Sequence, residues 1–336
     1  ETGKPLGMRA FPKGQGFTVG LLAVLSLAWL WPEGGQAGGP LRAEYSTMAA
    51  VGIIFLLQGL NLPISAFFLG LRNWKLHLFV QFFVFLTFPL LVFGMVAAGL
   101  LSEVWIPGFL FLSILPTTIS TAIVYTSSAG GDAAGATFNA TLSNFLGILI
   151  VPGWCALLVF PALEQSIQGD STEGFFADFL LRLIFLIVVP LFLGMLMRPL
   201  LGEGSESRGR LFRNLSFLGV LFIAYAGFCQ GFLGASSAQV VEACRQVLLP
   251  CMVLLAIVSL LAWVVPAVLG FHPSERLAAF FCSSQKSLAV GLPMGQLIFG
   301  LEHPQIFALL LPLVLYHVLQ LLLGGVVVGR FSEIPD

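Results

Sequence analysis

Lys286 is the only strongly charged residue that lies well inside a long apolar stretch, within the polar hexapeptide CSSQKS at positions 282–287. Placing a lysine at the centre of a membrane-spanning helix costs about 2.5–3.5 kcal/mol. No Asp or Glu is expected at the same depth, so water, backbone or an anion must offset that cost. Lys286 is therefore a fixed charge for an anionic substrate or a tether that bonds backbone carbonyls where two helices cross. A proton-switching role is a third possibility.

A second polar interruption, LPTTIST, spans positions 115–121 of another apolar stretch. Pro116 lacks a backbone donor, and the hydroxyls of Thr117, Thr118 and Thr121 compete for backbone partners. Unpaired backbone groups in lipid each cost several kcal/mol unless protein, water or a ligand meets them. Two such interruptions favour a polar site in the protein interior. The alternative is a proline-kinked helix whose hydroxyls bond the preceding turn.

Further polar side chains occur singly within apolar segments. Asn139 and Ser143 are spaced i, i+4 and share a helix face, from which Asn144 points aside, and Gln81 is another buried amide. Such oxygens suit Na⁺, although they could equally hold helices together at about 0.6 kcal/mol per bond. His317 lies in a leucine-rich segment and is either a substrate contact or a satisfied interior residue.

The sequence offers no catalytic triad, phosphate-binding loop or carboxylate pair, which argues against an enzyme or an ATP-driven pump. A resident metal centre is also disfavoured, because His317 and His77 are the only histidines expected within the membrane and no carboxylate joins them. The expected chemistry is therefore binding and movement of a solute, without a cofactor other than a possible Na⁺.

The composition requires that these residues be positioned by membrane-spanning helices. Of 336 residues, 58% are hydrophobic and only 9% are charged, whereas soluble domains contain about 25% charged residues. A helix needs about 20 apolar residues to cross the bilayer. The sequence predicts an all-α polytopic protein with ten spans, at about 17–31, 45–60, 76–100, 106–129, 132–160, 175–198, 211–233, 240–270, 274–300 and 304–329.

The segments outside these spans predict the topology. Residues 1–7 resemble a remnant of an expression tag, and residues 62–72 are too short to span and should lie near the surface. With a cytoplasmic N-terminus, Lys and Arg concentrate in the segments on the inner side, as the positive-inside rule requires. An odd number of spans would remove this bias, so we expect both termini in the cytoplasm.

The ten predicted spans form two similar groups of five. Pro89 in the third span and Pro266 in the eighth each precede a segment interrupted by small polar residues. An odd number of helices per repeat makes the second copy inverted in the membrane. Inverted repeats with paired interrupted helices are typical of secondary transporters.

Four segments, at 73–83, 130–148, 281–294 and 310–324, carry a resemblance to a known family. Through them the chain resembles the bile acid:sodium symporter family, closest to the branch that contains the seventh member of solute carrier family ten and bacterial relatives. The resemblance implies crossed, discontinuous helices four and nine, as in the related sodium/proton antiporters. It also implies a single transmembrane unit over 8–336, with a panel (17–60 and 175–233) facing a core (76–160 and 240–329).

The family's two sodium sites match this sequence in part. Thr121, Asn139 and Ser143 resemble ligands of one site, although Ala122 replaces an amide and the family's helix-nine glutamate position falls on Phe281 or Cys282. The other site is represented by Gln81, by Gln285 and by the adjoining Ser284.

Lys286 occupies the position where the family usually has an asparagine near the substrate. Compared with the family, this sequence lacks the helix-nine carboxylate and has the Lys286 ammonium nearby. This exchange suggests that Lys286 replaces at least one sodium. It would then compensate the half-helix dipoles or attract an anionic substrate.

The function predicted from these features is secondary transport of a small organic anion by alternating access. Expected contacts of that solute are Lys286, His317, Thr117, Thr118 and Ser287. A regulatory or scaffolding membrane protein on a transporter fold is the main alternative, and an ion channel is a third. The resemblance to bacterial members implies residence in a bacterial inner membrane. The sequence names neither the solute nor the oligomeric state.

Overall fold

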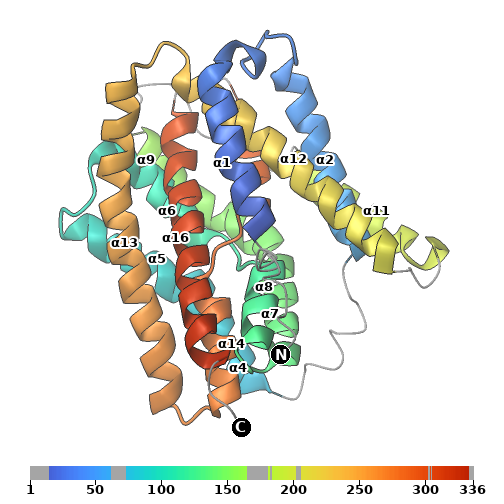
Figure 1. The fold of residues 1–336 in the computed structure, drawn as a ribbon, viewed down its shortest axis with the longest axis vertical. Helices are drawn as coiled ribbons and strands as arrows, with labels where there is room; N and C mark the ends of the chain where they lie inside the picture. The colour runs from blue at the N-terminus through green and yellow to red at the C-terminus, as the bar shows by residue number, and fades with distance from the viewer. Residues whose placement is uncertain are drawn as a thin grey trace, which may run out of the picture.

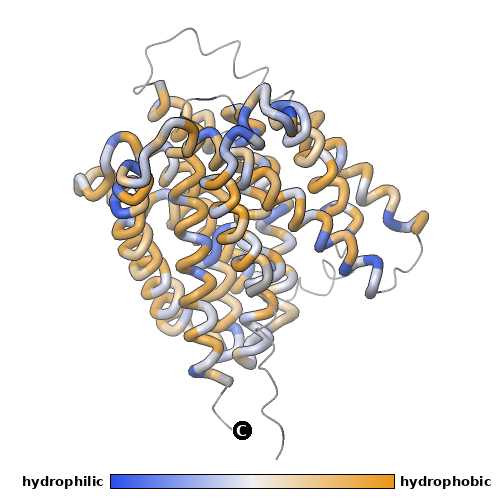
Figure 2. The backbone as a smooth tube through the Cα atoms, turned by 45° about the horizontal axis from the view of Figure 1, so that its top comes forward, coloured by the Kyte–Doolittle hydropathy of each residue, from blue (hydrophilic) through white to orange (hydrophobic). Residues whose placement is uncertain are grey.

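The computed structural model describes residues 15–61, 73–164, 181, 184–201, 206–301, 303 and 305–332, and within these ranges the regular structure is entirely helical. The predictions for residues 1–7 and 62–72, and for the start of the span at 175–198, fall outside the described residues. The helices pack side by side in one bundle, and long stretches of them consist of hydrophobic residues (Figures 1 and 2).

Within the described ranges, seven helices are long and apolar enough to cross a membrane. Several of them expose large apolar side chains, such as Leu249, Leu260 and Val268, which suit contact with lipid tails. The chain is therefore an integral membrane protein. The seven helices run over Ala43–Asn61, Trp74–Ala97, Ala133–Leu163, Ile184–Leu201, Ser207–Phe232, Ser237–Val268 and Ile306–Phe331.

The three remaining predicted spans consist of shorter helices. The first contains the apolar helix Val19–Leu30 within α1 (Gln15–Leu30). The fourth is divided into α6 (Ile106–Ile114) and α7 (Ser120–Ser128), and the ninth into α14 (Pro273–Ser284) and α15 (Leu288–Phe299). None of these pieces has the length of a full crossing, so the number ten stays a prediction.

The helices form two groups, and most helix contacts lie within a group rather than between the two groups. In the first, α2 (Ala43–Asn61) packs against α11 (Val189–Met197) and α12 (Glu206–Phe232), and α1 packs on α12. The close approach of α2 and α11 requires glycine, because a Cβ at Gly59 would overlap the Leu191 carbonyl oxygen and one at Gly194 the Leu56 carbonyl oxygen. In Figure 1 these four helices lie together on one side.

The second group surrounds the two divided helices. Here α13 (Ser237–Val268) packs on α14 and α16 (Ile306–Ser332), while α16 also packs on α6 and α15. On the other side α8 (Ala133–Trp154) contacts α4 (Trp74–Phe82), α7 and α14. The two groups meet where α12 contacts α15 and α16.

A π-helical turn, Phe83–Thr87, joins α4 to α5 (Phe88–Ala97). In such a turn each carbonyl bonds the N–H five residues further on, as the Phe83 carbonyl does with the Phe88 N–H. For Val84 that residue is Pro89, which has no N–H. The Val84 carbonyl is therefore free to accept a hydrogen bond from another element.

Candidate functional site

The two interruptions meet in the interior of the second group of helices. Non-helical backbone separates α6 from α7 at residues 115–119, and α14 from α15 at residues 285–287. The Ser287 N–H donates to the Pro116 carbonyl at 2.8 Å, so the two segments bond directly. Both backbone breaks are thus buried against each other, as unpaired backbone at membrane depth requires.

Lys286 lies at this contact with no exposed surface. Its ammonium donates to the carbonyls of Ser113 at 2.6 Å, Leu115 at 2.7 Å and Val84 at 2.9 Å. An ammonium has three N–H donors, and each of the three meets one carbonyl. The charge is therefore satisfied by backbone oxygen, as expected for the tether interpretation.

The position of the ammonium also has an electrostatic cause. Ser113 and Leu115 are at the C-terminal end of α6, where carbonyls lack helical partners and the helix dipole is negative. The Phe88 ring adds a cation–π contact, with its centroid 4.1 Å from the Lys286 Nζ atom. The Lys286 ammonium lies in the interruption between α14 and α15, and it compensates the negative dipole end of α6 at the other interruption.

The backbone of Lys286 is bonded as completely as its side chain. Its N–H donates to the Gln320 Oε1 atom at 2.7 Å, and its carbonyl accepts from the Gln320 Nε2 atom at 2.9 Å. Gln320 was not among the residues predicted for the site. Its signal in the sequence was a buried amide three residues after His317.

Three of the predicted residues form one cluster of polar side chains. The hydroxyls of Thr118 and Thr121 donate to the Gln285 Oε1 atom at 2.6 and 2.7 Å. Thr118 also accepts from the Ala122 N–H at 3.2 Å, which pairs a backbone donor in the first turn of α7. This cluster joins α7 to the interruption after α14.

Helix α8 supplies two contacts to the other interruption. The Ser143 hydroxyl accepts from the Thr117 N–H at 3.2 Å, and the Asn144 amide donates to the Thr117 carbonyl at 2.9 Å. Helical spacing predicted that Asn144 points aside from the Asn139–Ser143 face, but its longer side chain reaches back to the non-helical segment. The Thr117 hydroxyl itself is buried and has no partner among the described residues.

Two further predicted ion ligands, Gln81 and Asn139, form a separate pair. The Gln81 amide nitrogen contacts both the backbone oxygen of Asn139 at 3.2 Å and its side-chain oxygen at 3.3 Å. The Gln81 Oε1 atom has no partner among the described residues, and neither does the amide nitrogen of Gln285. Among the described residues, no hydrogen bond joins this pair to the Thr118–Gln285 cluster.

The hard oxygens of these clusters are of the kind that binds Na⁺, but they mostly bond one another. The described part of the chain contains no group of three His, Cys, Asp or Glu side chains that could hold a metal ion. The carbonyl oxygens of Ser113 and Leu115, next to the crossing, contact the Lys286 ammonium. The oxygen atoms thus fit a cation best at the position that the Lys286 ammonium already occupies.

Ser284 and Ser287 have backbone roles at the ends of α14 and α15. The Ser284 carbonyl accepts from the buried Tyr316 hydroxyl at 2.8 Å, and the Ser287 hydroxyl accepts from the Val290 N–H at 3.3 Å. Tyr316 was not among the predicted site residues, since an aromatic residue in an apolar segment gives no distinctive signal.

We expect Tyr316→Phe to lower the free energy of unfolding by about 1–3 kcal/mol, because the Ser284 carbonyl would lose its buried donor. The measurement is reversible unfolding in mixed micelles. Tyr45→Phe is the control, since the Tyr45 side chain is exposed on α2 and its loss should change stability little. Equal effects of the two substitutions would contradict this role of the Tyr316 hydroxyl.

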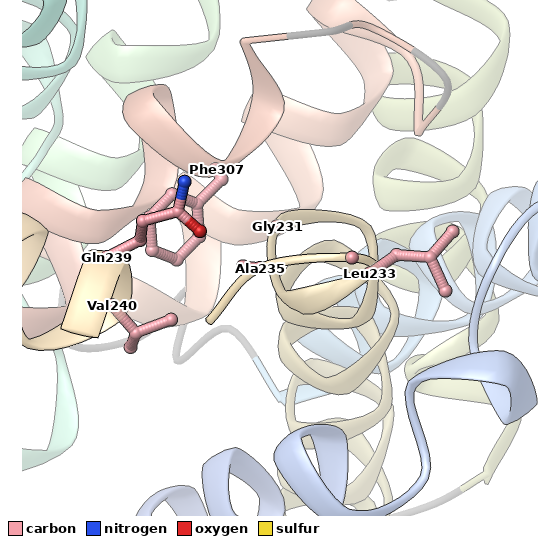
Figure 3. Close-up of a pocket in the computed structure, with 7 residues that line it drawn as sticks. Gly231, Leu233, Ala235, Gln239, Val240 and Phe307 are labelled. Atoms are coloured by element: carbon pink, nitrogen blue, oxygen red, sulfur yellow. The ribbon is translucent and has the colours of Figure 1, made fainter. Parts of the chain in front are cut away.

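A shallow cavity of about 310 Å³ lies away from these residues, at the connection between α12 and α13 (Figure 3). Glycines and residues with apolar side chains line it, among them Phe307 of α16, together with Gln239 as the polar side chain. None of the predicted site residues borders it.

The sequence is similar to several known proteins. The sequence model of the SBF-like CPA transporter family matches residues 15–333. Sodium/bile acid cotransporter 7 of Danio rerio is 32% identical over 333 residues, covering 96% of this chain and 94% of that protein. The putative symporter YfeH of Escherichia coli K12 is 30% identical, covering 94% and 92%. An uncharacterized protein of Pseudomonas aeruginosa, PA2026, is also 30% identical, covering 95% and 93%.

Proposed function

The chain belongs to the SBF-like CPA transporter family, and on this premise we propose that it is a secondary transporter of a small organic solute. The solute crosses by alternating access between the two groups of helices. The first group, α1, α2, α11 and α12, is the panel, and the group around the interrupted helices is the core. The packing within each group supports this division.

The observation that carries the mechanism is the bonding of Lys286. Its ammonium occupies a position surrounded by three carbonyl oxygens at 2.6–2.9 Å, which are ligands that a sodium ion could otherwise use. We propose that Lys286 replaces a coupling sodium and holds α5, α6 and the interruption before α15 together. Solute movement then does not require Na⁺ at this position.

The bonding of Lys286 also bears on the predicted anionic solute. All three donors of the ammonium are used by the protein, and the side chain is fully buried. In this arrangement Lys286 attracts an anion only through its field, while direct contacts come from other side chains. The solute class therefore has to be found by experiment, with anions and cations tested together.

Uptake into proteoliposomes with and without Na⁺ tests this function. A panel of organic anions and cations that includes taurocholate is first screened for thermal stabilisation of the wild type, and the stabilising solutes are then assayed. We expect wild-type uptake without Na⁺, and loss of at least nine-tenths of it in Lys286→Ala. Strictly Na⁺-dependent uptake that is unchanged in Lys286→Ala would refute the proposed role of Lys286. A protein that no solute stabilises would instead indicate the regulatory or scaffolding alternative.

The same proposal implies a location and an orientation. The E. coli and P. aeruginosa relatives favour a bacterial inner membrane, and the distribution of Lys and Arg favours cytoplasmic termini. In Figure 1 the C-terminal end of α16 lies at the same end of the bundle as the start of α14.

A further inference from the structure

The Gln320 amide can adopt only one orientation at the crossing. Its Oε1 atom must face the Lys286 N–H, which is a donor, and its Nε2 atom must face the Lys286 carbonyl, which is an acceptor. Exchanging the two ends of the amide would place donor against donor and acceptor against acceptor. The Lys286 peptide therefore determines which end of Gln320 faces each neighbour.

This orientation determines the tautomer of His317. The second hydrogen of the Gln320 Nε2 atom points to the His317 Nδ1 atom, 2.9 Å away. The Nδ1 atom must then accept, and a neutral imidazole carries its single proton on the other nitrogen. His317 consequently presents an Nε2–H donor.

That donor is buried and has no partner among the described residues. His317 is only 4% exposed, and leaving a buried donor unpaired is costly. A buried imidazole that keeps an unpaired N–H, and whose tautomer is fixed by a bonded neighbour, is suited to bind a ligand.

The donor lies where the panel meets the core. The Phe17 ring of α1 stands edge-on to the His317 ring, with centroids 5.7 Å apart. The same ring contacts Phe217 of α12 at 5.1 Å. Phe17 therefore lies between α12 and α16, and it covers the imidazole from the panel side.

We propose that His317 is a ligand-binding residue that donates its Nε2–H to an oxygen acceptor of the transported solute, and that Gln320 positions it. The inference rests on the proposed function, because the panel–core boundary is where a solute would pass. It adds a requirement on the solute, which must bring a carbonyl, carboxylate or hydroxyl oxygen to this point. Phe17 has to move aside when the solute binds, and the bond to Gln320 connects the solute to the Lys286 peptide.

The tautomer can be measured without any solute. Protein labelled with ¹⁵N-histidine, in nanodiscs at neutral pH, gives signals for four histidines, and His317→Gln identifies the signal of His317. We expect the proton on Nε2 in the wild type and a mixture of both tautomers in Gln320→Met. Gln296→Met is the matched control, since Gln296 is a buried glutamine on α15 whose side chain has no partner among the described residues, and it should leave the tautomer unchanged. A proton on Nδ1 in the wild type would overturn the inference, whether or not the protein transports.

The ligand role is tested by opening the cover. Phe17→Ala should create space beside the donor that acetophenone fills, because it combines an aromatic ring with one carbonyl acceptor. Ethylbenzene has the same shape without the acceptor. After correction for partition into lipid, we expect acetophenone to bind about twofold to tenfold more tightly, the range of one hydrogen bond, and to shift the His317 Nε2–H signal.

The preference for acetophenone should disappear when Phe17→Ala is combined with Gln320→Met, in which the donor is no longer held. Equal binding of the two probes to Phe17→Ala, or binding of neither, would overturn the ligand role of His317. These results do not depend on uptake. Failure of the transport assay would therefore count against the proposed function without changing the result for His317.

Discussion

Lys286→Met is expected to lower the free energy of unfolding by several kcal/mol. The substitution keeps an unbranched side chain of similar length but leaves the carbonyls of Val84, Ser113 and Leu115 without their donor. Each buried carbonyl that loses its partner costs about 1–3 kcal/mol, and the negative end of α6 also loses its compensating charge. The measurement is reversible unfolding of reconstituted protein in Na⁺-free buffer.

Lys75→Met is the matched control, because Lys75 is exposed on α4 and its removal should change stability by less than about 0.5 kcal/mol. If Lys286 replaces a sodium, added Na⁺ should restore part of the stability of Lys286→Met, whereas choline should not. Lys286→Arg should also destabilise, since a planar guanidinium cannot direct three donors as an ammonium does. A Lys286→Met protein as stable as Lys75→Met would exclude the tether.

Gly59→Ala should have the second large effect, because it forces the backbones of α2 and α11 apart. The new Cβ atom would overlap the Leu191 carbonyl oxygen, and backbone cannot move aside as a side chain can. Closely packed membrane helices depend on small residues at such contacts. Overpacking of this kind typically costs about 1–3 kcal/mol, which unfolding in mixed micelles would detect.

Gly52→Ala on the same helix is the control, since nothing lies within 4 Å of a Cβ added at Gly52. Replacing a helical glycine by alanine without a clash should stabilise the helix by about 0.5–1 kcal/mol. The two substitutions should therefore have opposite signs. Gly59→Ala that stabilises as much as Gly52→Ala would show that the α2–α11 contact is looser than described.

The membrane class of the protein follows from composition alone. A chain with 9% charged residues cannot cover itself with a water-facing surface, and its long apolar runs become the long helices of the structure. The two helix interruptions were also predictable, because Pro116 and the polar runs around positions 115–121 and 282–287 disfavour continuous helix locally. The family resemblance could be stated from short segments and is confirmed by the match over residues 15–333.

The sequence left open which groups would contact Lys286. Its partners come from positions 84, 113 and 115, far away along the chain, and they are backbone carbonyls that every residue possesses. A helical proline frees a carbonyl of the preceding turn, but which carbonyl it frees depends on the kind of turn. The availability of the Val84 oxygen depends on a π-turn before Pro89, and the turn is visible only in the folded chain.

Orientation of side chains was the other property that required the tertiary structure. Asn144 reaches Thr117, although helical spacing alone pointed it away, and Gln320 reaches the Lys286 peptide across the crossing. Periodicity along one helix gives the face of a residue but not the neighbour that meets it. The sequence by itself determined that a lysine and a histidine lie inside the membrane. Only the packing of the π-turn, α6 and α16 around Lys286 determined that three carbonyls satisfy the lysine, while the histidine keeps a donor without a partner among the described residues.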